Sequence, residues 1–241
     1  MEEKVAHAKE LIEEAVRSYP KIAVACSFGK DSMVTVHLAR EVAPEIKVFS
    51  IMTPYKPRET FEYLRKMNQV MNLGVTVYMV ADSIPEILQD GSLEVVLLPT
   101  EEFHQKAAQV KAQTGKEIYA INPDECCRLL KVEPTKVAVS DLEAWICGLR
   151  NTEGRTREDY QEVERKGGLI KVNPILTFTE TDIWKYMATR GIEPHPWYRR
   201  DYRSLGCEPC SHPGGELERD GRWQGTSKCG GECGIHTQRL K

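Results

Sequence analysis

A chain of 241 residues with 41% hydrophobic residues is long enough to bury one substantial core, with at most a small appendage. The formal net charge of −3 argues against a general nucleic-acid binder, which needs a basic surplus to neutralise phosphates. The first residues are charged and lack an apolar signal core, and no run of the sequence reaches the length of a membrane span. We therefore expect a cytoplasmic protein without membrane or nucleic-acid partners.

Most of the chain alternates between helical and strand patterns. Apolar residues at helical spacing predict an amphipathic helix at residues 3–18, which Pro20 ends. The elements predicted after it are strands at 22–25, 47–52, 75–80, 144–149 and 169–172, and helices at 33–42, 58–71, 84–88 and 180–188. Thr179 is the expected cap of the last helix. Such alternation predicts a doubly wound α/β fold, with a mostly parallel sheet covered on both faces.

This alternation of helical and strand patterns ends at about Pro194. The remaining stretch is rich in Gly, Pro, Arg and Cys and holds too few aliphatic residues for a core of its own. We divide the chain into an α/β domain at 1–200 and a C-terminal segment at 201–241 that ends in a flexible tail. Something outside that segment must order it.

A glycine-containing loop joins the strand at 22–25 to the next helix. In such a loop, backbone N–H groups and the helix dipole favour an anion over the helix N-terminus. An ordinary strand-to-helix turn capped by Asp31 or Ser32 explains the same sequence, and the spacing of a Walker A loop is absent. The loop resembles the pyrophosphate loop (PP-loop) of the adenine-nucleotide alpha-hydrolase superfamily. The substrate-binding candidates here are Ser27, Phe28, Gly29, Lys30 and Ser32.

Cysteine usage is the most informative part of the composition. In the reducing cytosol, eight cysteines indicate metal binding or thiol chemistry rather than a disulfide framework. Two close pairs lie far apart in the sequence, which is how a folded domain supplies four thiolates to one metal centre: Cys126, Cys127, Cys207 and Cys210. Adjacent cysteines favour an iron-sulfur cluster, while zinc and a redox disulfide remain alternatives.

Cys233 lies in the sequence Gly-Gly-Glu-Cys-Gly-Ile-His, where flanking glycines indicate freedom and exposure. A thiol becomes a useful nucleophile at neutral pH when nearby positive charge lowers its pKa. His236, Lys228, Arg219 and Arg222 are candidates for that charge, and the two arginines also suit an anionic oxygen. The alternative is a chemically idle tail.

Together these motifs resemble the assimilatory sulfonucleotide reductases, particularly adenylyl-sulfate reductases with a 4Fe-4S cluster. The likeness runs nearly end to end. Six blocks match in the order of the family: Cys126–Pro134, Asn173–Leu176, Thr179–Trp184, Gly206–Cys210, Glu218–Trp223 and Glu232–His236.

The resemblance implies thioredoxin-dependent reduction of adenylyl sulfate to sulfite and AMP in sulfate assimilation. Cys233 would attack the sulfate sulfur, expel AMP and carry an S-sulfocysteine, which a thioredoxin-type dithiol reduces. His236 would assist the thiol, and the cluster would have a structural and electrostatic role. The candidate donors to developing charge are Lys30, Arg150, Arg219 and Arg222, with Lys131 between cluster and substrate.

The phosphate loop departs from the reductase pattern. Gly29-Lys30-Asp31-Ser32 is closer to the pyrophosphatase branch of the superfamily than to the Gly-Ala-Glu-Asp form of reductases. An ATP pyrophosphatase of the tRNA-thiolation type with a cluster is therefore an alternative, although it leaves Cys233 without a function. A non-catalytic nucleotide and cluster sensor is a third.

Cys229 is the second departure, four residues before Cys233. We consider it a candidate resolving thiol that would attack the S-sulfonated Cys233; a spare thiol is the simpler interpretation. Cys26 and Cys147 fall in or beside predicted strands and are expected to be small core residues. The sequence leaves open the choice between adenylyl sulfate and its 3′-phosphorylated form, and whether the chain forms a homo-oligomer.

Overall fold

The computed structural model describes residues 1–154, 157–229 and 231–241. Its sheet has seven strands in the order β4-β3-β2-β1-β5-β7-β6, and its neighbours are parallel except for the antiparallel pair β6–β7. This confirms the predicted α/β class. The strands are β1 (Ile22–Ala25), β2 (Lys47–Met52), β3 (Thr76–Val80), β4 (Glu94–Leu98), β5 (Ala144–Ile146), β6 (Val163–Lys166) and β7 (Leu169–Val172).

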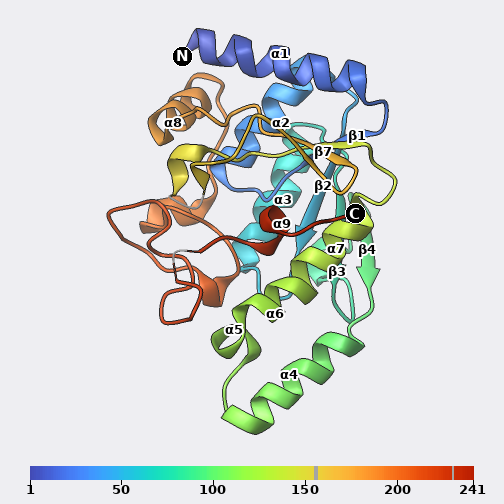
Figure 1. The fold of residues 1–241 in the computed structure, drawn as a ribbon, viewed down its shortest axis with the longest axis vertical. Helices are drawn as coiled ribbons and strands as arrows, with labels where there is room; N and C mark the ends of the chain where they lie inside the picture. The colour runs from blue at the N-terminus through green and yellow to red at the C-terminus, as the bar shows by residue number, and fades with distance from the viewer. Residues whose placement is uncertain (155–156, 230) are drawn as a thin grey trace.

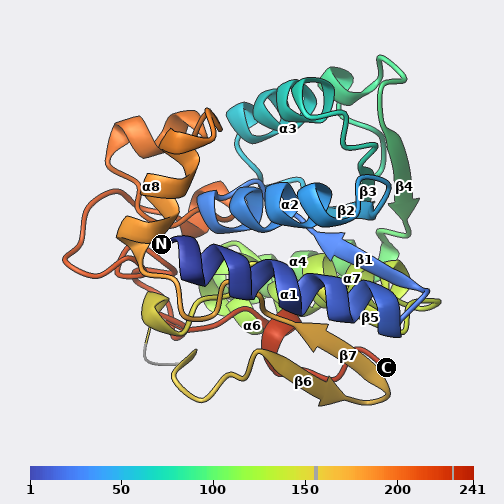
Figure 2. The same ribbon diagram turned by 90° about the horizontal axis from the view of Figure 1, so that it is seen from above.

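Helices cover both faces of this sheet (Figures 1 and 2). One face carries α1 (Glu2–Ser18), α2 (Lys30–Val42), α3 (Arg58–Val70) and α8 (Glu180–Thr189). On the other, α7 (Glu133–Ala138) packs on β2 and β3. It follows α4 (Glu101–Thr114), α5 (Ile118–Ile121), α6 (Pro123–Cys127) and the π-helix η2 (Arg128–Val132). Short turns η1 (Glu86–Leu88), η3 (Asn151–Glu153), η5 (Pro196–Arg200) and η6 (Glu208–Cys210) and the last helix α9 (Gly234–Thr237) complete the elements.

The central strands are apolar at nearly every position because both their faces are buried. In β1, Ile22 and Val24 join the core beneath α1 and α2, whereas Ala23 joins the opposite core with Phe49 and Trp145. The two cores therefore lie back to back across the sheet, as period-two alternation of side chains requires.

The π-helix η2 connects the vicinal cysteines to α7. Pro134 has no N–H to donate to the carbonyl four residues earlier, and its ring would crowd that carbonyl. The turn instead widens, with the Glu133 N–H donating to the Arg128 carbonyl, and the Thr135 hydroxyl donates to the Lys131 carbonyl at 2.6 Å. Lys131 lies in this widened turn. Such π-helical turns are frequent at functional sites.

The predicted elements agree with the structure within a few residues in the first half of the chain. Thr179 forms the expected cap, as a capping box with Asp182. The strands β4 and β6 and the helix α4 were not predicted. β4 is an edge strand with half-exposed apolar residues, so its pattern does not alternate clearly. No helix in the described ranges is long and apolar enough to cross a bilayer.

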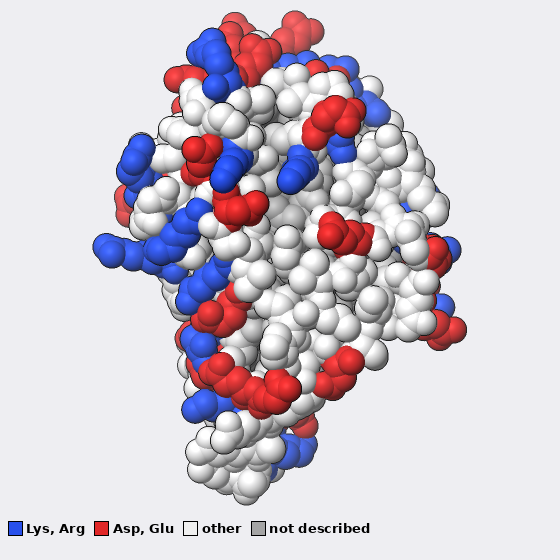
Figure 3. Space-filling model, turned by 90° about the vertical axis from the view of Figure 1, so that its right-hand side faces the viewer, with Lys and Arg blue, Asp and Glu red and all other residues white. Residues whose placement is uncertain are grey.

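The C-terminal segment packs on the main body rather than on itself. Trp223 shares a buried cluster with Cys127, Cys207 and Cys210, and Leu240 is buried against the core around Trp145. The tail is thus closed against the α/β body in this structure. On the face shown in Figure 3, charges of both signs are interspersed around a broad uncharged area, with no extended basic surface.

Candidate active site

A cavity of about 190 Å³ opens where β1, β2 and β5 end. From β1 the chain proceeds outward to β4 on one side and returns to β5 on the other, which makes this edge the switch point of the sheet. Ligands of open α/β sheets bind at such a point, outside the carboxyl ends of the strands. Residues of the phosphate loop and Cys233 both line this cavity.

The phosphate loop is held in shape by Ser32. Its hydroxyl donates to the Gly29 carbonyl at 2.9 Å and accepts from the Ser27 N–H and hydroxyl at 3.2 Å. The Tyr198 hydroxyl accepts the Lys30 N–H at 2.9 Å. The loop therefore forms a fixed turn over the N-terminus of α2.

The glycine after β5 permits close contact with this turn. A Cβ on Gly148 would lie 2.9 Å from the backbone N and Cα of Ser32. Any side chain there would push the phosphate loop out of place.

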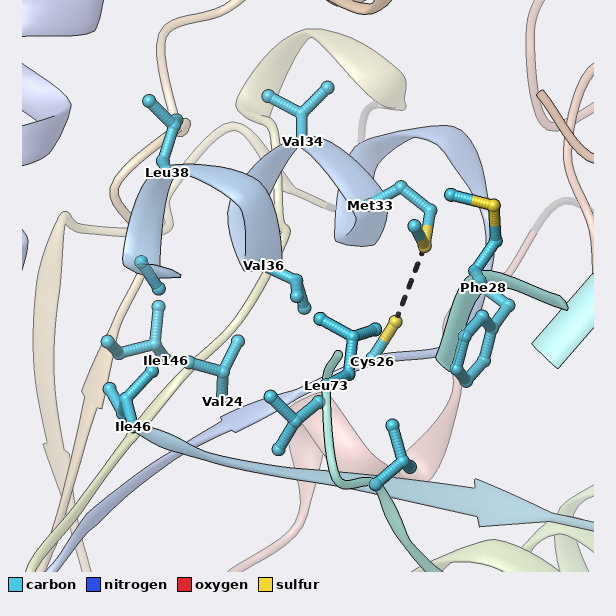
Figure 4. Packing of buried hydrophobic residues seen from close by; sticks show 14 of the residues in the cluster. Val24, Cys26, Phe28, Met33, Val34, Val36, Leu38, Ile46, Leu73 and Ile146 are labelled. Carbon is cyan, nitrogen blue, oxygen red and sulfur yellow. Dashed lines mark hydrogen bonds between the residues drawn. The ribbon is translucent and has the colours of Figure 1, made fainter. Parts of the chain in front are cut away.

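Phe28 and Arg150 do not line the cavity, unlike the other expected substrate-binding residues. Phe28 has a φ of +62°, which turns its ring into the core, where it meets Tyr63 edge-on at 6.2 Å. Figure 4 shows Phe28 beside Cys26 and Met33 in that core. Burial raises the pKa of Cys26 to about 11, consistent with the predicted core role.

Lys30 and Arg150 are both buried and neutralised by carboxylates behind the loop. Lys30 lies 2.8 Å from a Glu218 oxygen and donates to the Arg203 carbonyl at 3.0 Å. Arg150 contacts Asp31 and the same Glu218 oxygen, the latter at 2.5 Å. Burial alone would lower the pKa of Lys30, but Asp31 and other neighbours raise it, so this lysine stays charged.

Cys233 reaches the cavity because α9 packs on η2. Gly234 permits this contact, since a Cβ there would lie 2.9 Å from a Val132 methyl. The Cys233 N–H donates to a Glu232 oxygen at 2.8 Å, which fixes the backbone beside the thiol. The half-buried thiol is thereby directed into the cavity.

The charge beside Cys233 comes from Lys131. With Cys127 as a protonated thiol, its hydrogen bond to Cys233 and the charge of Lys131 lower the pKa of Cys233 against the opposing effect of burial. A metal-bound Cys127 has no proton to donate, so of these two groups only Lys131 would act in a loaded site. Burial opposes the charge of Lys131 as well, but Cys207, Cys127 and Cys233 raise its pKa. Lys131 therefore stays charged, and it lines both the cavity with Cys233 and a smaller pocket that contains Cys126, Cys127, Cys207 and Cys210.

His236 lines the cavity but is not a cation. Its ring stacks on Trp145 with centroids 6.3 Å apart, and its Nδ1 is buried without a partner among the described residues. Burial lowers the pKa of His236 well below its ordinary value, so the ring is neutral at pH 7. Its position suits a hydrogen-bond partner for a ligand rather than a source of charge.

Arg219 and Arg157 anchor the tail through two buried carboxylates. Arg219 lies 3.2 Å from Glu153 and 3.4 Å from Glu232, and donates to the Gly231 carbonyl at 2.6 Å. Arg157 pairs with the same two glutamates. Sequence reasoning missed Arg157, because no motif in the sequence between β5 and β6 marks it.

Arg222 is buried at the cysteine end of the cavity. It donates to the Ser211 hydroxyl at 2.7 Å and stacks over Trp223 at 4.5 Å. Gly206 gives it room, since a Cβ there would lie 2.0 Å from the guanidinium. In the described part of the chain Arg222 forms no ion pair, so its charge is available to a bound anion.

The two cysteine pairs line one small pocket. Cys126, Cys127, Cys207 and Cys210 are all buried there, and the Thr53 hydroxyl lies 3.2 Å from the Cys207 sulfur. The side chains are not gathered into a metal-binding group: within the described residues, no three Cys, His, Asp or Glu side chains are arranged to hold an ion. The donor set and its surroundings nevertheless suit a soft metal centre.

Cys229 is exposed, and no contact joins it to Cys233 among the described residues. Cys147 is buried in the core, where burial raises its pKa to about 12. Six of the eight cysteines are buried, so thiol chemistry with a partner is confined to the two in the tail.

Residues 21–213 match the model of the phosphoadenosine phosphosulfate reductase domain family. The chain belongs to this family. An adenosine 5′-phosphosulfate reductase of Geobacillus sp. is 32% identical over 234 residues, covering 95% of this chain and 89% of the relative. Another from Lysinibacillus sphaericus is 31% identical over 220 residues, covering 90% and 84%. The family match ends before Cys233, but the relatives' alignments extend over most of the chain.

Solved structures show the same fold. The phosphoadenylyl-sulfate reductase of Candida auris has a TM-score of 0.64 at 19% identity, covering 84% of this chain and 88% of that one. An FMN adenylyltransferase of Candida glabrata has a TM-score of 0.60 at 13% identity, covering 88% and 62%. Both support the adenine-nucleotide alpha-hydrolase-like fold predicted from the phosphate loop.

Proposed function

We propose that this protein reduces adenylyl sulfate to sulfite and AMP, with Cys233 as the nucleophile. The observation that carries the proposal is the cavity that joins the phosphate loop to the Cys233 thiol. Six cationic and three acidic side chains line it, which gives a net positive site within a chain of net charge −3. Relatives named adenosine 5′-phosphosulfate reductase support the same substrate.

In the first step the Cys233 thiolate attacks the sulfate sulfur. A sulfur–sulfur bond forms, the sulfur–oxygen bond to the phosphate breaks, and the electron pair leaves with AMP. Cys233 then carries an S-sulfo group. Lys131 beside the thiol stabilises the thiolate and the transferring oxygens.

In the second step an external dithiol of the thioredoxin type attacks the Cys233 sulfur. Sulfite leaves with the electron pair of the sulfur–sulfur bond, and the mixed disulfide is resolved by the second thiol of the donor, which restores Cys233. The two electrons come from the dithiol. The tail must open for this attack, since Cys233 is half-buried in the closed arrangement.

The nucleotide occupies the other end of the cavity. Ser27 and Gly29 would face its phosphate, with the Tyr198 hydroxyl beside them on the Lys30 N–H. Arg219 faces the same space and retains a buried Nε without a partner in the described residues. These groups would orient the phosphosulfate in line with Cys233.

Four thiolates suit a 4Fe-4S cluster held by Cys126, Cys127, Cys207 and Cys210. The fit rests on their sharing one pocket with no competing acidic side chain, and on the cations Lys131 and Arg222 nearby. When bound, such a cluster would join α6 to the C-terminal segment and add a charged centre beside Lys131. Iron and acid-labile sulfide analysis distinguishes it from zinc.

Two observations favour a second candidate, an ATP pyrophosphatase or nucleotidyl-transfer activity. Lys30 and Ser32 give the phosphate loop its pyrophosphatase form, and FMN adenylyltransferases share the fold. That function would leave the directed thiol of Cys233 unused. The 3′-phosphorylated substrate is the second variant of the main proposal, and the solved reductase of that name has the same fold.

The test compares three substrates with the cluster-loaded protein and thioredoxin. We expect sulfite from adenylyl sulfate, at a rate well above that from the 3′-phosphorylated form, and no pyrophosphate from ATP. Pyrophosphate release from ATP without sulfite from either sulfonucleotide would contradict the proposal. A preference for the 3′-phosphorylated form would correct the substrate and retain the chemistry.

A further inference from the structure

The cations of the cavity fall into two groups. Lys30, Arg157 and Arg219 form ion pairs with buried carboxylates. The other three form no ion pair in the ranges that the structure describes, although all three line the cavity: Lys56, Lys131 and Arg222. The paired group surrounds the phosphate loop and the tail anchor, whereas the unpaired group surrounds the cysteines.

Lys56 is held in place by the turn after β2. Its N–H donates to the Thr53 carbonyl at 3.1 Å, and the Thr53 hydroxyl contacts Cys207 at 3.2 Å. The next contact is the Tyr55 carbonyl, which accepts the Glu208 N–H at 2.7 Å. The turn is thus fixed to the second cysteine pair, and the Lys56 side chain extends into the cavity.

Its ammonium is close enough to Cys207, Lys131, Arg222 and Cys233 for their charges to act on it. In the described residues the ammonium makes no hydrogen bond and no ion pair. Gathering three cations in a partly buried site is unfavourable unless an anion joins them. Trp223 adds a buried indole N–H without a partner at the same end of the cavity.

We propose that Lys56, together with Lys131 and Arg222, binds the sulfo group of adenylyl sulfate and keeps hold of it after transfer to Cys233. This inference rests on the proposed function and adds to it a site specific for the sulfo oxygens. These three cations line the cavity together with the Cys233 thiol, and the sulfo group is the part of adenylyl sulfate that AMP lacks. Lys56 therefore distinguishes adenylyl sulfate from AMP.

The experiment measures binding of adenylyl sulfate and of AMP to cluster-loaded Lys56→Gln, Lys56→Arg and Lys185→Gln. Lys185 is exposed on α8 and supplies the matched control. Loss of a charged hydrogen bond predicts roughly 10- to 100-fold weaker binding of adenylyl sulfate by Lys56→Gln. AMP binding stays within about twofold, and Lys56→Arg recovers most of the loss because it restores the charge.

A second measurement needs no variant. Amine-reactive labelling of the wild-type protein, read by mass spectrometry, should show Lys56 protected by adenylyl sulfate and not by AMP. Equal labelling with both ligands, or Lys56→Gln with unchanged preference for adenylyl sulfate over AMP, would overturn the assignment. So would reduced iron content in Lys56→Gln with that preference intact, because Lys56 would then belong to the cysteine pocket.

These outcomes are separate from failure of the proposed function. A wild-type protein that releases no sulfite from adenylyl sulfate refutes the reaction, whatever Lys56 does. A wild-type protein that releases sulfite, with Lys56 indifferent to the sulfo group, refutes only the binding site.

Discussion

Replacing Glu232 by Gln tests how the tail is held closed. The Glu232 carboxylate pairs with Arg157 and Arg219, accepts the Cys233 N–H at 2.8 Å, and has a side chain only 5% exposed. The substitution keeps the shape and one acceptor oxygen but removes the charge. Two buried arginines are then left with Glu153 as their shared carboxylate.

Breaking a buried ion pair by removing one partner costs about 3–5 kcal/mol. We expect Glu232→Gln to lower the free energy of unfolding by about 3 kcal/mol at pH 7. This is the lower end of that range, because Glu153 still contacts both arginines. Burial alone would raise the pKa of Glu232, but Arg157 outweighs it and holds the pKa well below its ordinary value. The stability from this charge is therefore complete above pH ~4.3 and is lost as the pH falls below it.

The assay is urea unfolding of wild type and variant at several pH values, with hydrogen exchange of residues 231–241. Glu216→Gln is the matched control, since Glu216 is exposed in the same segment and its carboxylate has no ion pair in the described residues. We expect the variant to differ most from wild type near neutral pH and less in acid, with faster exchange in the tail. Equal stability of Glu232→Gln and Glu216→Gln at pH 7 would refute the anchor.

Three further predictions follow from single contacts. Gly148→Ala places a Cβ 2.9 Å from the Ser32 backbone, so we expect about 1–3 kcal/mol lower stability in thermal unfolding and weaker AMP binding; unchanged AMP binding would contradict it. Gly206→Ala displaces the Arg222 guanidinium, so sulfite release should fall at least tenfold, and wild-type kinetics would show that Arg222 is dispensable. A resolving role for Cys229 requires that Cys229→Ser abolish sulfite release without thioredoxin; unchanged release would assign the thiol no part in turnover.

The fold could be predicted from local patterns of apolar residues in the sequence. Buried strands and amphipathic helices repeat clearly up to β3, and Thr179 caps α8 as its sequence indicates. The edge strand β4 has no such pattern, and the position of Arg157 in the site depends on its ion pair with the distant Glu232. The close packing of Gly148 on the phosphate loop likewise cannot be predicted from the sequence alone.

For the candidate site, the sequence identified several of the residues but not the ion pairs that they form. It placed Cys233 and the phosphate loop in one site, and the cavity does contain both. It did not anticipate that Lys30 and Arg150 are neutralised by Glu218 and Asp31. Such ion pairs form between residues that are far apart in the sequence. They distinguish the paired cations Lys30, Arg157 and Arg219 from the three cations near Cys233, which form no ion pair in the described residues.

The central claim is that Cys233 takes the sulfo group from the nucleotide. The most direct test is intact-protein and peptide mass spectrometry after one turnover of adenylyl sulfate without any dithiol. We predict that the peptide containing Cys233 gains the mass of one SO₃ group, in proportion to the AMP formed, and that Cys233→Ser gains none and forms no AMP. AMP and sulfite formation by Cys233→Ser, or an SO₃ group on another residue, would contradict the account.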